Sequence, residues 1–371
     1  MKNPNILFVM ADDMGYWSMG CAGNKEVQTP NLDRLAEEGM YFPEYFCTSP
    51  VCSPARASVL CGKMPSGHGV LDWISKGHIN YEDVASDLRK AHQDPRAPWE
   101  YAWSKQQLEG DEAIRYMEGL RTYTDILAEH GYICGLAGKW HLGDAGCPQH
   151  GFSYWEPLAM GGDNYFYPVV LRDVKFDMLR HTYITNYITD KALDFLRNRD
   201  TEKPFYLSVH YTAPHSPWER NQHPEEFYDL YQDCPFVETP NVPPHKWGHA
   251  YSQEERRKRL QGYYAAVTAM DSDIGKLVGY LKKEGLWDDT IVIFTADNGM
   301  SMGHHGIFGK GNGTFPLNMY DTAVRVPMIV TYPRGIRGGC VAKGLYSHYD
   351  LMPTIAGLMG EAPEEGCPGF L

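Results

Sequence analysis

The sequence predicts an α/β fold, with a large mixed, mostly parallel central sheet that is sandwiched by helices. Short apolar runs rich in β-branched and aromatic residues alternate with helix-like stretches along the chain, a pattern typical of parallel strands that are buried on both faces. Each apolar run is bounded by Gly, Pro or Asp, which interrupt strands. The expected strands are 5–11, 132–138, 205–211, 290–296 and 326–332.

The expected helices lie between these strands. Pro30 and Gly39 mark the ends of the first, because Pro suits the first turn of a helix and Gly the residue that ends it. The expected helices are 30–39, 183–198, about 253–284 and roughly 350–359. We expect one domain over 1–371, with two insertions: the polar segment 76–118 and a proline-rich loop on the substrate side, 216–252.

Composition narrows the class of protein. The 371 residues include 47 acidic and 34 basic side chains, a formal net charge of −13, so binding to nucleic acid or to an anionic membrane is not expected. No apolar run approaches the roughly 18 residues of a membrane-spanning helix. The N-terminus passes directly into the first expected strand, with no signal peptide visible, which predicts a cytoplasmic protein. The nine scattered cysteines form no CxxC pair, and most are interpreted as small buried hydrophobes.

Oxygen-bearing side chains follow two of the expected strands. Asp12 and Asp13 come after the first, and Asp297 and Asn298 after the fourth. Ligands bind at the carboxyl ends of parallel strands, and carboxylate and amide oxygens suit Ca²⁺ or Mg²⁺. Each pair alone has a plainer interpretation, a helix cap or a turn. Two such strand ends in one sheet favour a metal site, and the lack of His or Cys in either disfavours zinc.

A further motif surrounds Cys52. Pro54 fits the first turn of a helix that Gly62 ends, so Cys52 is expected just before the N-terminus of that helix, where the amide groups and the dipole favour an anion. Arg56 follows one turn later. The pattern indicates a reactive cysteine; the alternative is a structural cysteine beside a surface arginine.

Lys139 and His141 form another candidate pair, within Gly138-Lys139-Trp140-His141. In an extended segment their side chains would point to the same side. A cation beside a titratable imidazole suits an anionic group with a leaving oxygen, although single Lys and His residues are commonly just surface groups.

Together these segments resemble the type I, formylglycine-dependent sulfatases of the alkaline-phosphatase superfamily. Cys52-Ser53-Pro54-Ala55-Arg56 matches the C-x-P-x-R maturation motif of that family, and residues 131–141 match its second signature, which ends in G-K-W-H. Asp12-Asp13 and Asp297-Asn298 match its metal-ligand positions. The resemblance runs in the family's order from residue 5 to about 371.

The resemblance implies a mechanism. A maturation enzyme, as a transient partner, would oxidise Cys52 to formylglycine, whose hydrate attacks the sulfur of a sulfate ester. Ca²⁺, with Mg²⁺ as the alternative, would be held by Asp12, Asp13, Cys52, Asp297 and Asn298. The remaining catalytic residues would be Arg56, which holds the hydrate, Lys139 and Lys310, which neutralise sulfate oxygens, His141 as proton acceptor, and His215, from an A-P-H-x-P match, as acid for the leaving oxygen.

Some expectations concern departures from the family. Members usually continue into a smaller C-terminal subdomain, which we expect to be absent or truncated here. His304 stands where Glu is usual, so roles for His304 and His305 stay open, as does that of His210.

The expected substrate is a small sulfated molecule, with a sulfated carbohydrate preferred. Aromatic and polar residues in two loops are candidates to contact a sugar ring, with ordinary loop packing as an equal alternative: Trp218, Arg220, His223 and Trp247 in one, Gly161 to Tyr167 in the other. Two other functions stay open. One is a phosphonate monoester or phosphodiester hydrolase with the same site, and the other is a non-catalytic sulfated-glycan binder if Cys52 is unmodified.

Overall fold

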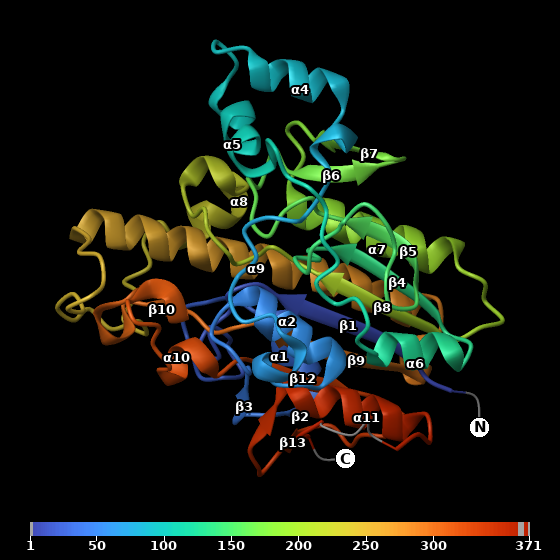
Figure 1. Ribbon diagram of the computed structural model, residues 1–371. Coiled ribbons are helices and arrows are strands. Elements are labelled where there is room, and N and C mark those ends of the chain that lie inside the picture. Colours follow the sequence, from blue (N-terminus) through green and yellow to red (C-terminus); the bar gives the residue numbers. More distant parts are fainter. Residues whose placement is uncertain (1–2, 363–366, 370–371) are drawn as a thin grey trace.

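An eight-stranded sheet with the order β13-β2-β12-β9-β1-β8-β4-β5 lies at the centre of the fold (Figure 1). The computed structural model describes residues 3–362 and 367–369. The strands of the sheet are β1 (Asn5–Ala11), β2 (Met40–Tyr41), β4 (Ile133–Gly138), β5 (Phe152–Pro157), β8 (Phe205–His210), β9 (Thr290–Ala296), β12 (Met328–Thr331) and β13 (Cys340–Val341).

The sheet is mixed and mostly parallel, as the sequence predicted. β1 pairs in parallel with β8 and β9, and β4 with β5 and β8, whereas β12 runs antiparallel to β9 and β2. The register of β1 and β9 aligns Ala11 with Ala296. Asp12 and Asp297, which directly follow these two residues, therefore lie side by side at the edge of the sheet. The register of β1 and β9 thus determines where the candidate site forms.

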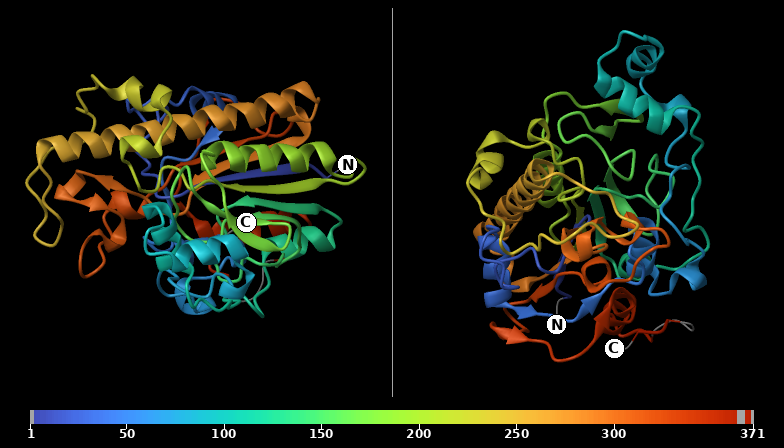
Figure 2. Two further views of the ribbon diagram at one scale, coloured as in Figure 1. Left: turned by 90° about the horizontal axis from the view of Figure 1, so that it is seen from above. Right: turned by 90° about the vertical axis from the view of Figure 1, so that its left-hand side faces the viewer.

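Helices cover both faces of the sheet. α7 (Ile184–Asn198) and α1 (Pro30–Glu38) pack against the long α9 (Gln253–Lys283), while α2 (Cys52–Cys61), α6 (Tyr123–Glu129) and α11 (Leu351–Leu358) pack against one another. Seen from above, α7 and α9 lie on one side of the sheet and α6 on the other (Figure 2, left). The expected helices agree with α1, α7, α9 and α11 within about two residues.

The remaining elements lie in the segments that join the strands. They are β3 (Tyr45–Phe46), α3 (Pro65–His68), α4 (Ser86–Gln93), α5 (Trp99–Leu108), β6 (Val169–Arg172), β7 (Lys175–Met178), α8 (Glu225–Tyr228), β10 (Ser301–Met302), β11 (Phe308–Gly309), α10 (Asp321–Val324) and β14 (Tyr346–Ser347).

The segment 76–118 is more ordered than its polar composition indicated. It contains α4 and α5, and it has a small core of its own that includes Val84, Leu88 and Leu108 and reaches Phe176 in β7. α4 and α5 project at the top of Figure 1. No helix within the described residues combines the length and the apolar character needed to cross a membrane.

Candidate active site

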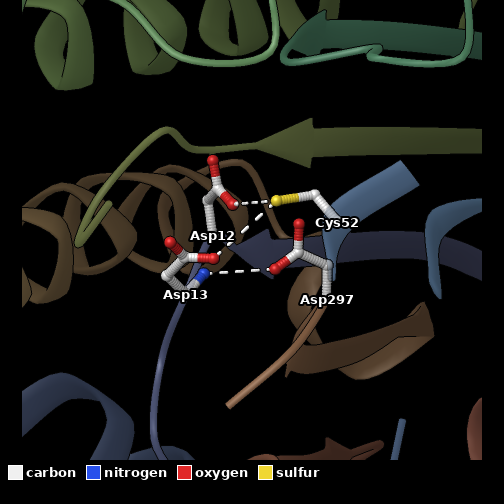
Figure 3. Close-up of side chains that lie close together, drawn as sticks. All are labelled: Asp12, Asp13, Cys52 and Asp297. Carbon is white, nitrogen blue, oxygen red and sulfur yellow. Dashed lines mark hydrogen bonds between the residues drawn. The ribbon is translucent and has the colours of Figure 1, made fainter. Parts of the chain in front are cut away.

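Four buried side chains meet at the carboxyl ends of β1 and β9. Asp12 and Asp13 follow β1, Asp297 follows β9, and Cys52 opens α2. One ligand atom from each residue lies within 4.8 Å of the ligand atoms of the other three (Figure 3). The structure therefore brings together residues that are up to 285 positions apart in the chain, from Asp12 to Asp297.

Two buried lysines contact this group. The Nζ of Lys139 donates to Asp12 Oδ2 at 2.5 Å. The Nζ of Lys310 donates to Asp13 Oδ1 at 2.6 Å and to Cys52 Sγ at 2.7 Å. An ammonium group thus lies beside the sulfur atom of Cys52, where it can neutralise negative charge that develops on a group bound there.

Arg56 supplies the third buried cation. Its Nε donates to Asp297 Oδ2 at 2.8 Å, and the two side chains are 2% and 0% exposed. Its Nη1 donates to the carbonyl of Lys139 at 3.0 Å. A charge buried this deeply is tolerated only with a partner, so Arg56 fixes the carboxylate of Asp297 and the backbone of the β4 segment together.

The pKa values of the three carboxylates are shifted in different directions. Burial raises the pKa of Asp12, and repulsion from Asp297 raises it further. Burial also opposes ionisation of Asp13 and Asp297, but Lys310 lowers the pKa of Asp13 and Arg56 lowers that of Asp297. Ionised Asp12 thus carries a cost that its neighbours do not offset, and a further cation would relieve it.

Asn298 tests whether a metal fits this site. Its Nδ2 donates to Asp13 Oδ1 at 2.8 Å and to the carbonyl of Gly299 at 2.9 Å. Its buried Oδ1 has no hydrogen-bond partner among the described residues. A lone buried carbonyl oxygen beside three carboxylates is an oxygen-rich donor set that suits Ca²⁺ or Mg²⁺, so the residues present fit such an ion.

The backbone at Asp13 is held in an unusual conformation. Its φ of 62° lies in the left-handed region, which is costly for a residue other than glycine. The hydroxyl of Tyr263 donates to the carbonyl of Asp13 at 3.3 Å and accepts from the amide of Gly15 at 3.1 Å. Tyr263, which no motif singles out, therefore holds the backbone at Asp13 in place.

His141 lies beside Lys139, but not in the extended segment that we expected. Its φ is 57°, and its Nε2 contacts the carbonyl of Ile74 at 2.9 Å. Because a carbonyl only accepts, Nε2 carries the proton, which leaves buried Nδ1 as an acceptor without a partner in the described part of the chain. Burial and then Lys139 hold the pKa of His141 well below its usual value. A Cβ on Gly161 would come 2.1 Å from this imidazole, so only glycine fits there.

His215 is the most solvent-accessible of the six candidate catalytic residues. Its side chain is 22% exposed, and its Nε2 lies 3.5 Å from Asp13 Oδ2. The Nδ1 of His215 donates to the carbonyl of Ser216 at 2.7 Å. The hydroxyl of Tyr165 donates to the main-chain carbonyl of His215 at 2.8 Å. The imidazole is thus fixed at the side of the site that water reaches.

The structure also shows the surroundings of the three histidines whose roles the sequence left open. His210 ends β8, and its Nδ1 contacts the carbonyl of Lys139 at 3.0 Å, the same oxygen that Arg56 binds. Burial, followed by Arg56, lowers the pKa of His210 to about 3, so it is neutral. His304 packs on Trp17 and His305 stacks on Tyr320, at centroid distances of 4.7 and 4.0 Å.

Several of the expected sugar-contacting residues are buried. Trp218 is 6% exposed and Tyr165 is completely buried, and His223 is buried as well. For these residues ordinary loop packing is the correct interpretation. Arg220 forms an ion pair with Asp229, while Trp247 is exposed.

Comparisons with known proteins agree with this geometry. The sulfatase family model matches residues 4–361. An N-acetylglucosamine-6-O-sulfatase of Bacteroides thetaiotaomicron is 29% identical over 98% of this chain and 69% of its own, and the human N-acetylgalactosamine-6-sulfatase is 29% identical over 97% and 63%. The chain thus spans about two thirds of the length of these curated relatives.

A solved structure matches as well. A protein in complex with its substrate, D-glucosamine-2-N,6-O-disulfate, superposes with a TM-score of 0.75 and 25% identity, covering 99% of this chain and 79% of that one. The buried acidic cluster beside Cys52, the mixed sheet that positions it and the match over nearly the whole chain lead to one conclusion. The chain belongs to the sulfatase family.

Proposed function

We propose that this protein hydrolyses a sulfate monoester of a carbohydrate to an alcohol and inorganic sulfate. Residue 52, as formylglycine, is the nucleophile, and a divalent cation, Ca²⁺ in preference to Mg²⁺, is the cofactor. One observation carries the proposal: the Sγ of Cys52 lies 2.7 Å from Lys310 Nζ and 3.4 Å from Asp12 Oδ1, within a fully buried cluster of three carboxylates and three cations.

The relatives support the class of substrate. The names of two curated relatives refer to 6-sulfated N-acetylhexosamines, and one matching structure contains a sulfated glucosamine as its substrate. We therefore choose 6-sulfated hexosamines as the first substrates to test.

The metal would be held by Asp12, Asp13, Asp297, Asn298 and residue 52, and when bound it supplies Lewis-acid catalysis. Lys139 and Lys310 place two ammonium groups beside this set of residues. There they bind sulfate oxygens and stabilise the negative charge that builds on them. The three buried cations balance the three carboxylates, so a bound divalent cation would leave the site positive, which would explain how a chain with a net charge of −13 accepts an anionic ester.

The two histidines move protons at different atoms. Nδ1 of His141 is an unprotonated acceptor in a dry environment and takes a proton from residue 52. Nε2 of His215, at the solvent-accessible side, gives a proton to the leaving oxygen, while its Nδ1 stays bound to Ser216. Arg56 keeps Asp297 ionised and in place throughout.

Two measurements test the proposal. The first is the intact mass of the protein purified from its natural source, where conversion of Cys52 lowers the mass by the thiol-to-aldehyde difference. The second is sulfate release from 6-sulfated N-acetylhexosamines and from an aryl sulfate, with Cys52→Ala as the control. We expect release by the wild type and at least a thousandfold loss in the variant.

Three outcomes contradict the proposal. Faster cleavage of an aryl phosphonate than of an aryl sulfate would make the protein a phosphonate monoester hydrolase. A wholly unconverted Cys52 together with saccharide binding and no turnover would make it a glycan-binding protein. Full activity of Cys52→Ala would exclude residue 52 as the nucleophile.

A further inference from the structure

One exposed segment beside the site is held unusually firmly. We call residues 68–79 the strap. Within it Leu71, Asp72, Trp73, Ser75 and Lys76 are exposed, and Ile74 is buried. Trp73 is 51% exposed, and no aromatic ring or cation stacks on its indole within the described residues. An exposed indole has a free aromatic face on which the apolar face of a ligand can stack.

Hydrogen bonds tie the start of the strap to α2, the helix that begins at Cys52. Nε2 of His68 donates to the hydroxyl of Ser58 at 3.0 Å, and Nδ1 of His68 accepts from the amide of Val70 at 3.2 Å. The amide of Ile74 donates to the hydroxyl of Ser53 at 3.0 Å. The strap therefore keeps a fixed position relative to the nucleophile.

A buried carboxylate fixes the other end of the strap. Asp111, which is 4% exposed, accepts from the amides of Gly77 at 2.7 Å, His78 at 2.9 Å and Ile79 at 3.4 Å. Asp111 belongs to the polar segment 76–118, so this insertion has an identifiable effect at the site. Between the two anchors, exposed side chains stand on a rigid backbone, and such preorganisation lowers the entropic cost of binding.

The strap reaches the reacting groups directly. The carbonyl of Ile74 accepts the hydrogen bond from His141, and the Cα of Trp73 is about 3.8 Å from that of Ile74 along the chain. The indole of Trp73 is thus one residue from a group that touches the proposed proton acceptor. Around the same strand ends, Trp218 and Tyr165 are buried, whereas Trp73 is exposed.

We propose that residues 71–76 of the strap form the subsite for the sugar ring of the substrate, with the indole of Trp73 stacked on a sulfated hexopyranose. The C–H groups of the ring pack on the electron-rich aromatic face, and the exposed Asp72 and Lys76 face the hydroxyl groups. This inference rests on the proposed function, because it assigns the carbohydrate part of the same ester.

Trp99 offers a matched control. It is also 51% exposed, but it lies on α5, at the top of Figure 1, within the projecting part of the insertion. If exposure alone explained an effect of Trp73, Trp99 would show the same effect.

The experiment compares Trp73→Ala, Trp73→Phe and Trp99→Ala with the wild-type protein. It measures kcat and KM for sulfate release from a 6-sulfated N-acetylhexosamine, and the inhibition constant of inorganic sulfate. For Trp73→Ala we expect about a fivefold to tenfold higher KM, kcat within about twofold, and unchanged sulfate inhibition. Trp73→Phe should restore most of the affinity, and Trp99→Ala should behave as wild type.

Some results would overturn the subsite. One is an unchanged KM in Trp73→Ala; another is a sulfate inhibition constant that rises as much as KM, since Trp73 would then act on the sulfate position through the fold. If the wild type releases no sulfate from any sugar, the proposed function fails separately. Calorimetric titration with the sulfated hexosamine then decides the subsite: weaker binding to Trp73→Ala supports it, and equal or absent binding in both proteins refutes it.

Discussion

The charged cluster and the strap lie side by side and are built in opposite ways. In the cluster, made of Asp12, Asp13, Arg56, Lys139, Asp297 and Lys310, the side chains are buried and bond to one another. In the strap it is the backbone that forms hydrogen bonds with the rest of the protein. Its side chains from Leu71 to Lys76 are exposed, except that of Ile74. Any change in the cluster disturbs a charge balance, whereas the exposed residues of the strap can change with little cost to the fold. The cluster therefore tolerates few substitutions, whereas the exposed positions of the strap tolerate many.

The largest expected effect comes from the cluster. Arg56→Met leaves the carboxylate of Asp297 buried without its cation, so we expect a loss of about 3–5 kcal/mol in the free energy of unfolding. Urea denaturation measures it. Arg220→Met is the matched control, because its ion pair with Asp229 is exposed, and it should cost much less stability than Arg56→Met. Equal losses in the two variants would contradict the contrast between buried and exposed pairs.

Calcium should stabilise the cluster and leave the strap unaffected. At a free concentration 100 times its dissociation constant, a bound ion adds about 2.7 kcal/mol to the free energy of unfolding. Thermal unfolding with Ca²⁺ and with a chelator measures this difference. In Asn298→Leu, which removes the unpartnered Oδ1, the stabilisation should shrink. A wild-type protein that gains nothing from either Ca²⁺ or Mg²⁺ would refute the metal site.

The sequence anticipated the cluster better than its surroundings. Asp12 and Asp297 stand directly after apolar runs, so the rule that parallel strands end at one edge brings them together. Tyr263 and Ile74 could not be anticipated, because each acts through a main-chain contact with a segment that is distant in sequence.

The sequence also did not reveal which aromatic side chains are buried and which are exposed. Trp218 was a candidate sugar contact in the sequence and Trp73 was not, yet Trp218 is 6% exposed and Trp73 is 51% exposed. The short β2 and β13, of two residues each, and the half-exposed β5 lacked an apolar pattern long enough to predict them. The cytoplasmic location and the lack of a further C-terminal subdomain stay predictions.

Acid should weaken the anchor at the start of the strap, because a protonated His68 can no longer accept from the amide of Val70. Burial lowers the pKa of His68 to about 4, against 6.5 when it is unfolded, so the native state holds a neutral ring while the unfolded state binds a proton between these values. The stability that this gives is complete above pH 6.5 and is lost as the pH falls toward 4, by about 2 kcal/mol. His68→Gln should remove this part of the pH dependence in urea titrations. An identical pH profile in the variant would show that His68 does not titrate as described.

The smallest expected effect tests whether the anchoring of the strap backbone by Asp111 acts through the contact between Trp73 and the sugar. Asp111→Asn keeps one oxygen acceptor but loses the charge that strengthens the bonds to the amides of Gly77 and His78, so about 1 kcal/mol of stability should go. If a rigid backbone presents Trp73, KM for the sulfated sugar should rise about threefold in this variant, although Asp111 is buried and touches no substrate. The double variant Asp111→Asn with Trp73→Ala should show no further rise over Trp73→Ala, because the anchor acts through the indole. Independent, additive increases in KM would mean that the strap affects the site by a route other than Trp73.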